Sequence, residues 1–257
     1  MPRASFDLAG RNALVTGAAQ GLGAAMSIAL AGHGANIAVL DKAPRSDSIP
    51  NAAIEGFGCK SKYIEGDVPN LDDCQNAVRA VVNDWGGLDI LVNNAGIAVN
   101  GPAESISLTD VQHVFDINLF GMLMCCQAAF SALQASSHAS VVNIASIAGI
   151  SVLRPQNHVG YNTAKAAVIS LTRTLAVEWA ETGIRVNAIA PGYMTSPAVE
   201  LLRARSPENW EAWMARVPMG RAGDPSELGG AAVFLASDAS SYVTGSVLVV
   251  DGGYTSL

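Results

Sequence analysis

The sequence has few charged residues and no concentration of positive charge. Only 14% of its 257 residues are charged, and the 22 Asp and Glu outnumber the 15 Lys and Arg, for a net charge of −7. This balance argues against a nucleic-acid partner, because phosphate binding depends on clustered Lys and Arg. Since half of the residues are hydrophobic, the low charged fraction also predicts a homo-oligomer, in which subunit contacts cover additional surface.

The sequence also lacks the spacing of a metal site or a disulfide framework. Its cysteines (Cys59, Cys74, Cys125 and Cys126) form no CxxC pair, and its four histidines have no ligand spacing. We therefore expect buried thiols and no metal. No apolar stretch of signal-peptide length precedes the first expected strand, and we find no apolar segment of 18 residues later, so we expect a cytoplasmic protein without a membrane partner.

Apolar runs alternate with helical segments along the whole chain. The runs cover residues 12–16, 35–41, 62–67, 88–94, 140–146, 185–191 and 246–252, and helices are expected to start near Gly21, Leu71, Thr109, His158 and Pro225. Asp224 before Pro225, with Glu227 after it, has the pattern of a capped helix start. Because most runs are continuously apolar, they predict an α/β fold with a parallel seven-stranded sheet and helices on both faces. We see no linker and expect a single domain over residues 1–257.

Tyr161 and Lys165, in the segment YNTAK, carry the strongest functional signal. Residues four apart share one face of a helix, so the ammonium would lie beside the phenol and lower its pKa. A phenol with a lowered pKa can take a proton from an alcohol as a hydride leaves, or return one to a carbonyl. Ser146 could hydrogen-bond the oxygen where charge develops. This set of residues predicts an oxidoreductase.

The segment TGAAQGLG, from Thr16 to Gly23, follows an apolar run and opens a helical one. That context favours a phosphate-binding turn, in which Gly17 permits the tight turn, Gly21 lets the backbone approach a pyrophosphate and Gly23 allows close helix packing. Asp41 ends the second apolar run, where a carboxylate can bind both hydroxyls of the adenosine ribose. It would repel a 2′-phosphate, so we expect NAD rather than NADP, although Lys42 and Arg45 follow it.

Taken in order, TGAAQGLG, Asp41, Asp67, NNAG, Asn118, Ser146, YNTAK, PGYMTS and DGGYT resemble the short-chain dehydrogenase/reductase family of compact type. The resemblance covers nearly the whole chain and implies a Rossmann fold. Residues of about 10–100 would mainly bind the dinucleotide, and about 115–220 would hold the catalytic residues and a mobile lid with Trp210 and Trp213.

The resemblance also implies the site residues. The catalytic set would be Asn118, Ser146, Tyr161 and Lys165, with a water held by Asn118 linking Lys165 to solvent. The cofactor-binding set would be Gly17, Gln20, Gly21, Leu22, Gly23, Asp41, Asp67, Val68, Asn94, Ala95, Gly96, Tyr161, Lys165, Pro191, Gly192, Met194 and Ser196. The family usually has threonine where this chain has Ser196, so the hydroxyl of Ser196 or of Thr195 could bond the carboxamide of the nicotinamide.

The residues restrict the substrate less. The segments around YNTAK and the C-terminal tail resemble polyol and sugar-alcohol dehydrogenases, and gluconate 5-dehydrogenases share much of that tail. Gln156, Asn157 and His158 could meet substrate hydroxyls, or they could be exposed loop and helix-start residues. The alternatives are an NADPH-dependent 3-oxoacyl carrier-protein reductase, which Asp41 and the negative charge disfavour, and a nucleotide-binding protein without catalysis.

Assembly is inferred from the resemblance. Family members of this size are usually tetramers or dimers that pack through the long helices, here near residues 108–135 and 158–181. A homotetramer or homodimer is therefore expected.

Overall fold

The chain folds around one seven-stranded sheet. The computed structural model describes residues 5–44, 50–154, 156–195, 199, 203–204 and 207–257. Its strands are β1 Asn12–Thr16, β2 Asn36–Asp41, β3 Ser61–Glu65, β4 Ile90–Asn93, β5 Ser140–Ile144, β6 Arg185–Pro191 and β7 Val247–Val250. All six neighbouring strand pairs are parallel. The predicted α/β fold with a parallel seven-stranded sheet is confirmed.

The strand order is β3-β2-β1-β4-β5-β6-β7. The chain moves outward from β1 to β3 and then crosses back, so β1 lies between β2 and β4. In an open α/β sheet, ligands bind beyond the carboxyl ends of the strands where the order reverses. The topology therefore places a ligand crevice at the ends of β1 and β4.

Each central strand contributes side chains to two apolar cores. In β1, Ala13 and Val15 belong to the core on one face of the sheet, whereas Leu14 belongs to the core on the other. Ile37 and Leu40 of β2 divide in the same way. Successive side chains of a strand point to opposite faces, which explains why these strands are continuously apolar.

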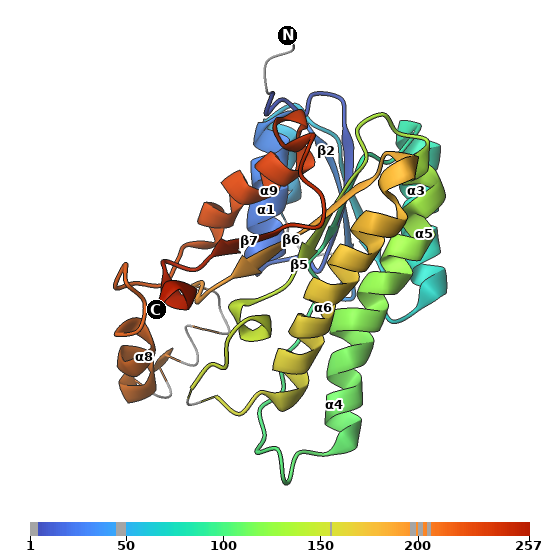
Figure 1. The fold of residues 1–257 in the computed structure, drawn as a ribbon. Helices are drawn as coiled ribbons and strands as arrows, with labels where there is room; N and C mark the ends of the chain where they lie inside the picture. The colour runs from blue at the N-terminus through green and yellow to red at the C-terminus, as the bar shows by residue number, and fades with distance from the viewer. Residues whose placement is uncertain (1–4, 45–49, 155, 196–198, 200–202, 205–206) are drawn as a thin grey trace.

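Helices cover both faces of the sheet (Figure 1). The described α-helices are α1 Gly21–Gly32, α2 Asn51–Gly56, α3 Leu71–Trp85, α4 Leu108–Phe115, α5 Met122–Gln134, α6 Val159–Glu178, α8 Pro207–Met214 and α9 Gly229–Ala236. Short 3₁₀ turns are η2 Ile147–Gly149, η3 Ala180–Thr182, η4 Pro225–Leu228, η5 Asp238–Ser240 and η6 Tyr254–Ser256. One core lies under α1 and α9, and the other lies under α3, α5 and α6.

Some helices are capped at their start by a side chain, whereas α1 is not. Asn70 caps α3 by accepting a hydrogen bond from the backbone N–H of Asp72. The predicted start at Asp224 is present as a capping box, although it opens a 3₁₀ turn before α9. By contrast, the side chain of Gln20 makes no capping hydrogen bond at the start of α1. The first N–H groups of α1 therefore remain available to an anion.

The helical run Leu108–Gln134 consists of α4, the π-helix η1 Asp116–Gly121, and α5. It is long and apolar enough to cross a membrane, with a mean hydropathy of 1.4. This differs from the expectation that no segment would meet that test. Within the fold, α4 packs against α6 and α5 packs against α3, so one side of the run is covered by the protein's own helices.

The agreement between observed and predicted bounds differs from strand to strand. The ranges 12–16 and 185–191 match β1 and β6, whereas the expected 88–94 is shortened to Ile90–Asn93. Helices begin where they were expected near Gly21, Leu71, Thr109 and His158. The prediction omitted the short helix α2.

Candidate active site

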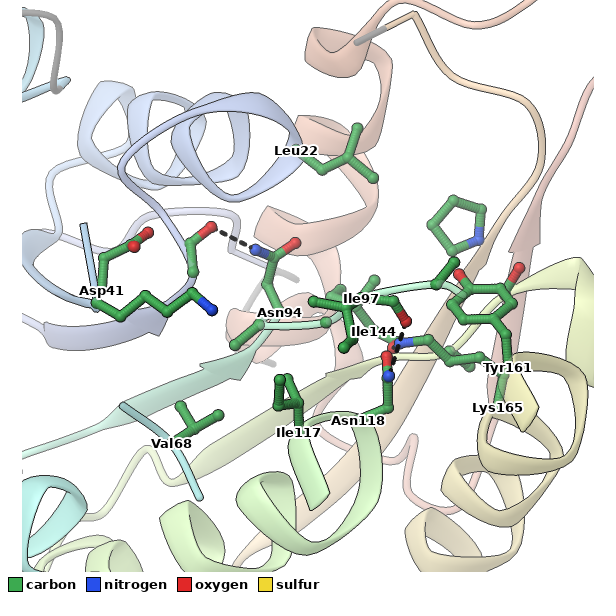
Figure 2. A pocket seen from close by; sticks show the side chains of 18 of the residues that line it. Leu22, Asp41, Val68, Asn94, Ile97, Ile117, Asn118, Ile144, Tyr161 and Lys165 are labelled. Carbon is green, nitrogen blue, oxygen red and sulfur yellow. Dashed lines mark hydrogen bonds between the residues drawn. The ribbon is translucent and has the colours of Figure 1, made fainter. Parts of the chain in front are cut away.

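A cavity of about 510 Å³ runs along the carboxyl ends of the central strands. Figure 2 shows Asp41 at one end of the cavity and Tyr161 with Lys165 at the other. Asp41 comes from β2, whereas Tyr161 and Lys165 come from α6. The crossover at β1 and β4 thus brings segments that are far apart in sequence into one elongated site.

The turn between β1 and α1 is built at very close range. Gly17 has a φ of +62°, and a Cβ there would lie 2.7 Å from the Cα of Ala95. A Cβ at Gly23 would lie 2.6 Å from the carbonyl oxygen of Gly17. Gly21 has a φ of +61° but open space beside it. Glycine is therefore required for contact at Gly17 and Gly23, and for backbone conformation at Gly21.

Hydrogen bonds fix this turn to the end of β4. The hydroxyl oxygen of Thr16 accepts from the N–H groups of Asn94 and Ala95, both at 3.0 Å. The side chain of Asn94 donates to the carbonyl oxygens of Thr16 at 3.0 Å and Gly17 at 2.8 Å. The floor of the cavity is thus held in place by satisfied polar groups before any ligand binds.

The carboxylate of Asp41 is held by two backbone amides. One oxygen accepts from Ala19 at 2.9 Å, and the other accepts from Ala43 at 3.0 Å. Each oxygen retains further acceptor capacity, and the residue lines the cavity. Its neighbour Lys42 lines the cavity as well.

At the other end, Lys165 is a buried cation with 3% of its surface exposed. Its Nζ donates to the carbonyl oxygen of Ile144 at 2.7 Å and lies 5.6 Å from the centroid of the Tyr161 ring. No carboxylate of the described chain forms an ion pair with it. Burial lowers the pKa of Lys165 to about 8, because a charged ammonium is disfavoured away from water.

The pKa of Tyr161 differs in direction from the sequence prediction. Burial raises the pKa of the phenol above its ordinary value, and the Ser146 hydroxyl, close enough to bond it, acts in the opposite direction. The helical spacing does bring Lys165 close, but desolvation of the phenolate dominates. The lowered pKa of Tyr161 that was expected from the Tyr–Lys spacing alone is therefore wrong.

Asn118 lies in the π-helix η1, with its side chain buried. Its Nδ2 donates to the carbonyl oxygens of Ile97 and Val114, both at 2.8 Å. Its Oδ1 is buried and has no hydrogen-bond partner among the described residues. The bond to Val114 occurs where the helix widens, a feature often found at functional sites. Asn118 thus presents an acceptor that is free to bind a donor.

Most of the predicted residues line the cavity. They are Gly17, Gln20, Leu22, Asp41, Asp67, Val68, Asn94, Ala95, Gly96, Asn118, Ser146, Tyr161, Lys165, Pro191 and Gly192. Gly21 and Gly23 shape the turn without lining the cavity. Met194 does not line it either, because its side chain is buried in the core beneath α1 and α9. Ser196 lies outside the described residues, and the Thr195 hydroxyl donates to the carbonyl oxygen of Gly223 at 3.3 Å.

The sequence analysis missed several apolar lining residues. They are Leu40, Ile97, Ala98, Ile117, Ile144 and Ala145, together with Gly66. Each lies within two residues of one that was identified, as Ile117 lies beside Asn118. Adjacency to a motif was the available signal, but apolar residues at strand ends are equally typical of a core.

The three predicted substrate residues do not line this cavity. Asn157 is exposed, and its carbonyl oxygen accepts from the N–H of Gly101 at 2.9 Å. His158 packs edge-on against Tyr161, with ring centroids 5.7 Å apart. Gln156 donates to the hydroxyl of Tyr193 at 3.1 Å. In the predicted lid, Trp213 of α8 stacks on Tyr193.

The chain is similar to known proteins over nearly its whole length. A family model described as enoyl-(acyl carrier protein) reductase matches residues 17–255. Galactitol 2-dehydrogenase (L-tagatose-forming) of Cereibacter sphaeroides is 40% identical over 253 residues, covering 98% of each chain. The structure of a short-chain type dehydrogenase/reductase from Mycobacterium marinum is 39% identical, with a TM-score of 0.91 and 97% of each chain covered. A structure from Beutenbergia cavernae with bound NADP at low occupancy is 37% identical, with a TM-score of 0.89, covering 98% of this chain and 99% of that one.

Proposed function

The chain belongs to the short-chain dehydrogenase/reductase family and is an oxidoreductase, and we propose that it uses NAD to interconvert a polyol and its ketone. The observation that carries this proposal is the arrangement of the cavity, with the Asp41 carboxylate at one end and Tyr161 and Lys165 at the other. Ser146 lines the same cavity and lies within hydrogen-bonding reach of Tyr161. The first end suits a ribose, and the second suits proton transfer to or from an alcohol oxygen.

The residues of the cavity fit a dinucleotide. The start of α1 has no side-chain cap, which leaves its first N–H groups able to bind a pyrophosphate. Gly17 packs closely against Ala95 and has no side chain that would obstruct the phosphates. Asp41 would accept hydrogen bonds from both ribose hydroxyls and would repel a 2′-phosphate by like charge. The positive charge of Lys42 would reduce that repulsion. It would not replace the two hydrogen bonds that the carboxylate accepts from the ribose hydroxyls. We therefore propose NAD as the preferred cofactor.

The catalytic roles follow from the positions of the polar groups. A bound nicotinamide would supply the hydride acceptor or donor. Tyr161 would take the proton of the alcohol during oxidation and return it during reduction, while Ser146 would hydrogen-bond the reacting oxygen. Lys165 beside the ring would stabilise the phenolate, opposing the effect of burial. The free Oδ1 of Asn118 would hold a donor such as water on the path of the proton to solvent.

The choice of substrate rests on similarity. Galactitol 2-dehydrogenase is related to this chain along its full length, and we propose a sugar alcohol as the substrate class. The test is to follow absorbance of the reduced nicotinamide with NAD or NADP against hexitols, pentitols, gluconate, simple secondary alcohols and an acetoacetyl thioester. Rapid NAD reduction by a polyol supports the proposal. Oxidation of NADPH confined to the thioester would refute both the cofactor and the substrate.

The role of Tyr161 has its own test. Tyr161→Phe should lower kcat by at least about a hundredfold, the lower range for general acid–base catalysis, with little change in the dissociation constant of NAD. The matched control is Tyr242→Phe, because the side chain of Tyr242 is fully exposed. Near wild-type turnover of Tyr161→Phe would show that another group moves the proton.

We further propose a cytoplasmic homo-oligomer, a tetramer or a dimer, that packs through the long helices. The apolar residues left exposed on these helices include Leu108 of α4 and Val159 and Val177 of α6. Light scattering coupled to size exclusion measures the mass, and a monomer would refute this assembly.

A further inference from the structure

A hydrogen-bonded amide and phenol lie outside the lining of the cavity, on two chain segments that adjoin its catalytic end. Gln156 lies in the segment that leads into α6 and Tyr161, and Tyr193 directly follows Pro191 and Gly192, which line the cavity. The Nε2 of Gln156 donates to the Tyr193 hydroxyl at 3.1 Å. The pair thus joins the two chain segments that flank the position of the reacting oxygen.

The surroundings of this pair are apolar. Ile147 and Ala148, which follow Ser146, belong to a buried cluster against which both Tyr161 and Tyr193 pack. The ring of Tyr193 therefore packs against the same apolar wall as the catalytic tyrosine, and Gln156 is hydrogen-bonded to the Tyr193 hydroxyl at that wall. Polar groups placed sparsely in an apolar wall are what gives a ligand site its specificity.

The ring of Tyr193 is held rigidly in that wall. It stacks on Trp213 with centroids 5.4 Å apart and an angle of 6° between the planes, and it meets Tyr254 edge-on at 5.7 Å. Burial raises the pKa of Tyr193 to about 12, so its hydroxyl keeps its proton near neutral pH. The Nε1–H of Trp213 is buried and bonds no acceptor among the described residues.

The pair is joined by one ordinary and one long hydrogen bond. Besides accepting from Nε2 of Gln156 at 3.1 Å, the Tyr193 hydroxyl donates to Oε1 of Gln156 at 3.4 Å, which is longer than an ordinary O–H···O bond. A ligand hydroxyl could therefore replace the long bond with two shorter ones. An alcohol group is a donor and an acceptor at once, so it would accept from Tyr193 and donate to Gln156. A hydrogen atom or a methyl group would use neither.

We propose that Gln156 and Tyr193 together bind a second substrate hydroxyl, beyond the reacting carbon, and thereby select polyols over simple secondary alcohols. This inference rests on the proposed polyol dehydrogenase function and assigns its specificity to two residues outside the catalytic set. Neither residue exchanges a proton with the substrate, so their effect should appear in discrimination between substrates.

The test compares Tyr193→Phe, Gln156→Leu and the double variant on two substrates, the polyol that the wild-type enzyme oxidises fastest and cyclohexanol. Tyr193→Phe keeps the ring that stacks on Trp213 and removes only the hydroxyl. For each single variant, the ratio of kcat/KM for the polyol to kcat/KM for cyclohexanol should fall about five- to tenfold, the effect of one neutral hydrogen bond. Because both residues would bind one hydroxyl, the double variant should lose less than the product of the single effects.

Tyr242→Phe is the control for the loss of a tyrosine hydroxyl, and thermal unfolding checks that each variant is folded. If kcat/KM falls equally for both substrates, or falls for neither, the ratio is unchanged. That result would overturn the inference while leaving the proposed function intact. A wild-type enzyme that oxidises cyclohexanol but no polyol would refute the substrate class and this inference together. A fall in the ratio of kcat/KM for the polyol to kcat/KM for cyclohexanol supports both the substrate class and this inference.

Discussion

Replacement of the buried Lys165 by methionine should make the pH dependence of stability differ from that of the wild-type protein. Burial lowers the pKa of Lys165 to about 8, against 10.5 for an exposed lysine. Between these values, the unfolded chain binds a proton that the folded chain has released. Stability rises with pH wherever the unfolded state binds more protons, so the wild-type protein should gain stability from about pH 8 upward. Methionine at this position has no proton to lose.

The size of the effect follows from the same two pKa values. At about 1.36 kcal/mol for each unit of pKa, burial of the charged ammonium destabilises the fold by about 3 kcal/mol at neutral pH. The methionine side chain of the Lys165→Met variant avoids this penalty, but it leaves the carbonyl oxygen of Ile144 without its donor, which costs about 1–3 kcal/mol. The difference in stability at pH 7 is therefore small, whereas its change with pH is large.

The assay is urea unfolding of the nucleotide-free wild type and Lys165→Met at pH 7, 8, 9 and 10. All other groups titrate in both proteins, so the difference isolates Lys165. By pH 10 the wild-type protein should have gained about 2–3 kcal/mol relative to the variant. Lys60→Met is the control, because Lys60 is exposed, and its curve should run parallel to the wild-type curve. Parallel curves for Lys165→Met would refute the argument that this ammonium is desolvated.

Three further predictions concern the cofactor end and the thiols. Asp41→Asn should lower the ratio of kcat/KM with NAD to kcat/KM with NADP by at least about tenfold, as loss of one close like-charge contact implies; an unchanged ratio in steady-state kinetics would contradict this role. Gly23→Ala brings a Cβ to 2.6 Å from the Gly17 carbonyl oxygen, whereas Gly230→Ala in α9 meets no atom within 4 Å; calorimetric titration should therefore find NAD binding weakened by Gly23→Ala and unchanged by Gly230→Ala, and equal affinities of the two variants would count against the steric reasoning. Cys59 is half-buried and the other cysteines are buried, so a thiol reagent should label one cysteine first in the native protein and all four only after denaturation; rapid labelling of several would contradict the buried positions.

The type and order of the strands could be predicted from their apolar runs, but the points where strand pairing stops could not. The ranges of β1 and β6 were predicted correctly, whereas those of β4 and β5, although these strands are fully buried, were predicted too long. At the end of β4, Asn94 leaves the sheet to bond Thr16 and Gly17. An apolar pattern records which residues avoid water, but it does not record where strand pairing stops. The π-helix at Asn118 could not be predicted either, because its apolar pattern does not distinguish it from the α-helices on both sides.

The candidate site shows the same division. Spacing was sufficient to place Tyr161 beside Lys165 and to assign Ser146 to the same end of the cavity. The direction of the Tyr161 pKa was wrong, because spacing on a helix gives the distance between two groups but not how much water surrounds them. Gln156 was proposed as a substrate residue, yet its partner Tyr193 comes from a different segment, and only the fold brings the two side chains together.

The distribution of unsatisfied polar groups separates the two ends of the cavity. At the end where Asp41 lies, Asp41 and Asn94 have backbone partners that fix the turn between β1 and α1 without a ligand. At the other end, Lys165 is buried as a cation, and the Oδ1 of Asn118 has no partner in the described chain. Such groups destabilise a fold unless a ligand engages them, and perturbed groups of this kind gather where chemistry occurs. Because a ligand that binds beside Asp41 requires little change in the protein, its binding energy can offset the cost of the buried polar groups at the end where Lys165 and Tyr161 lie.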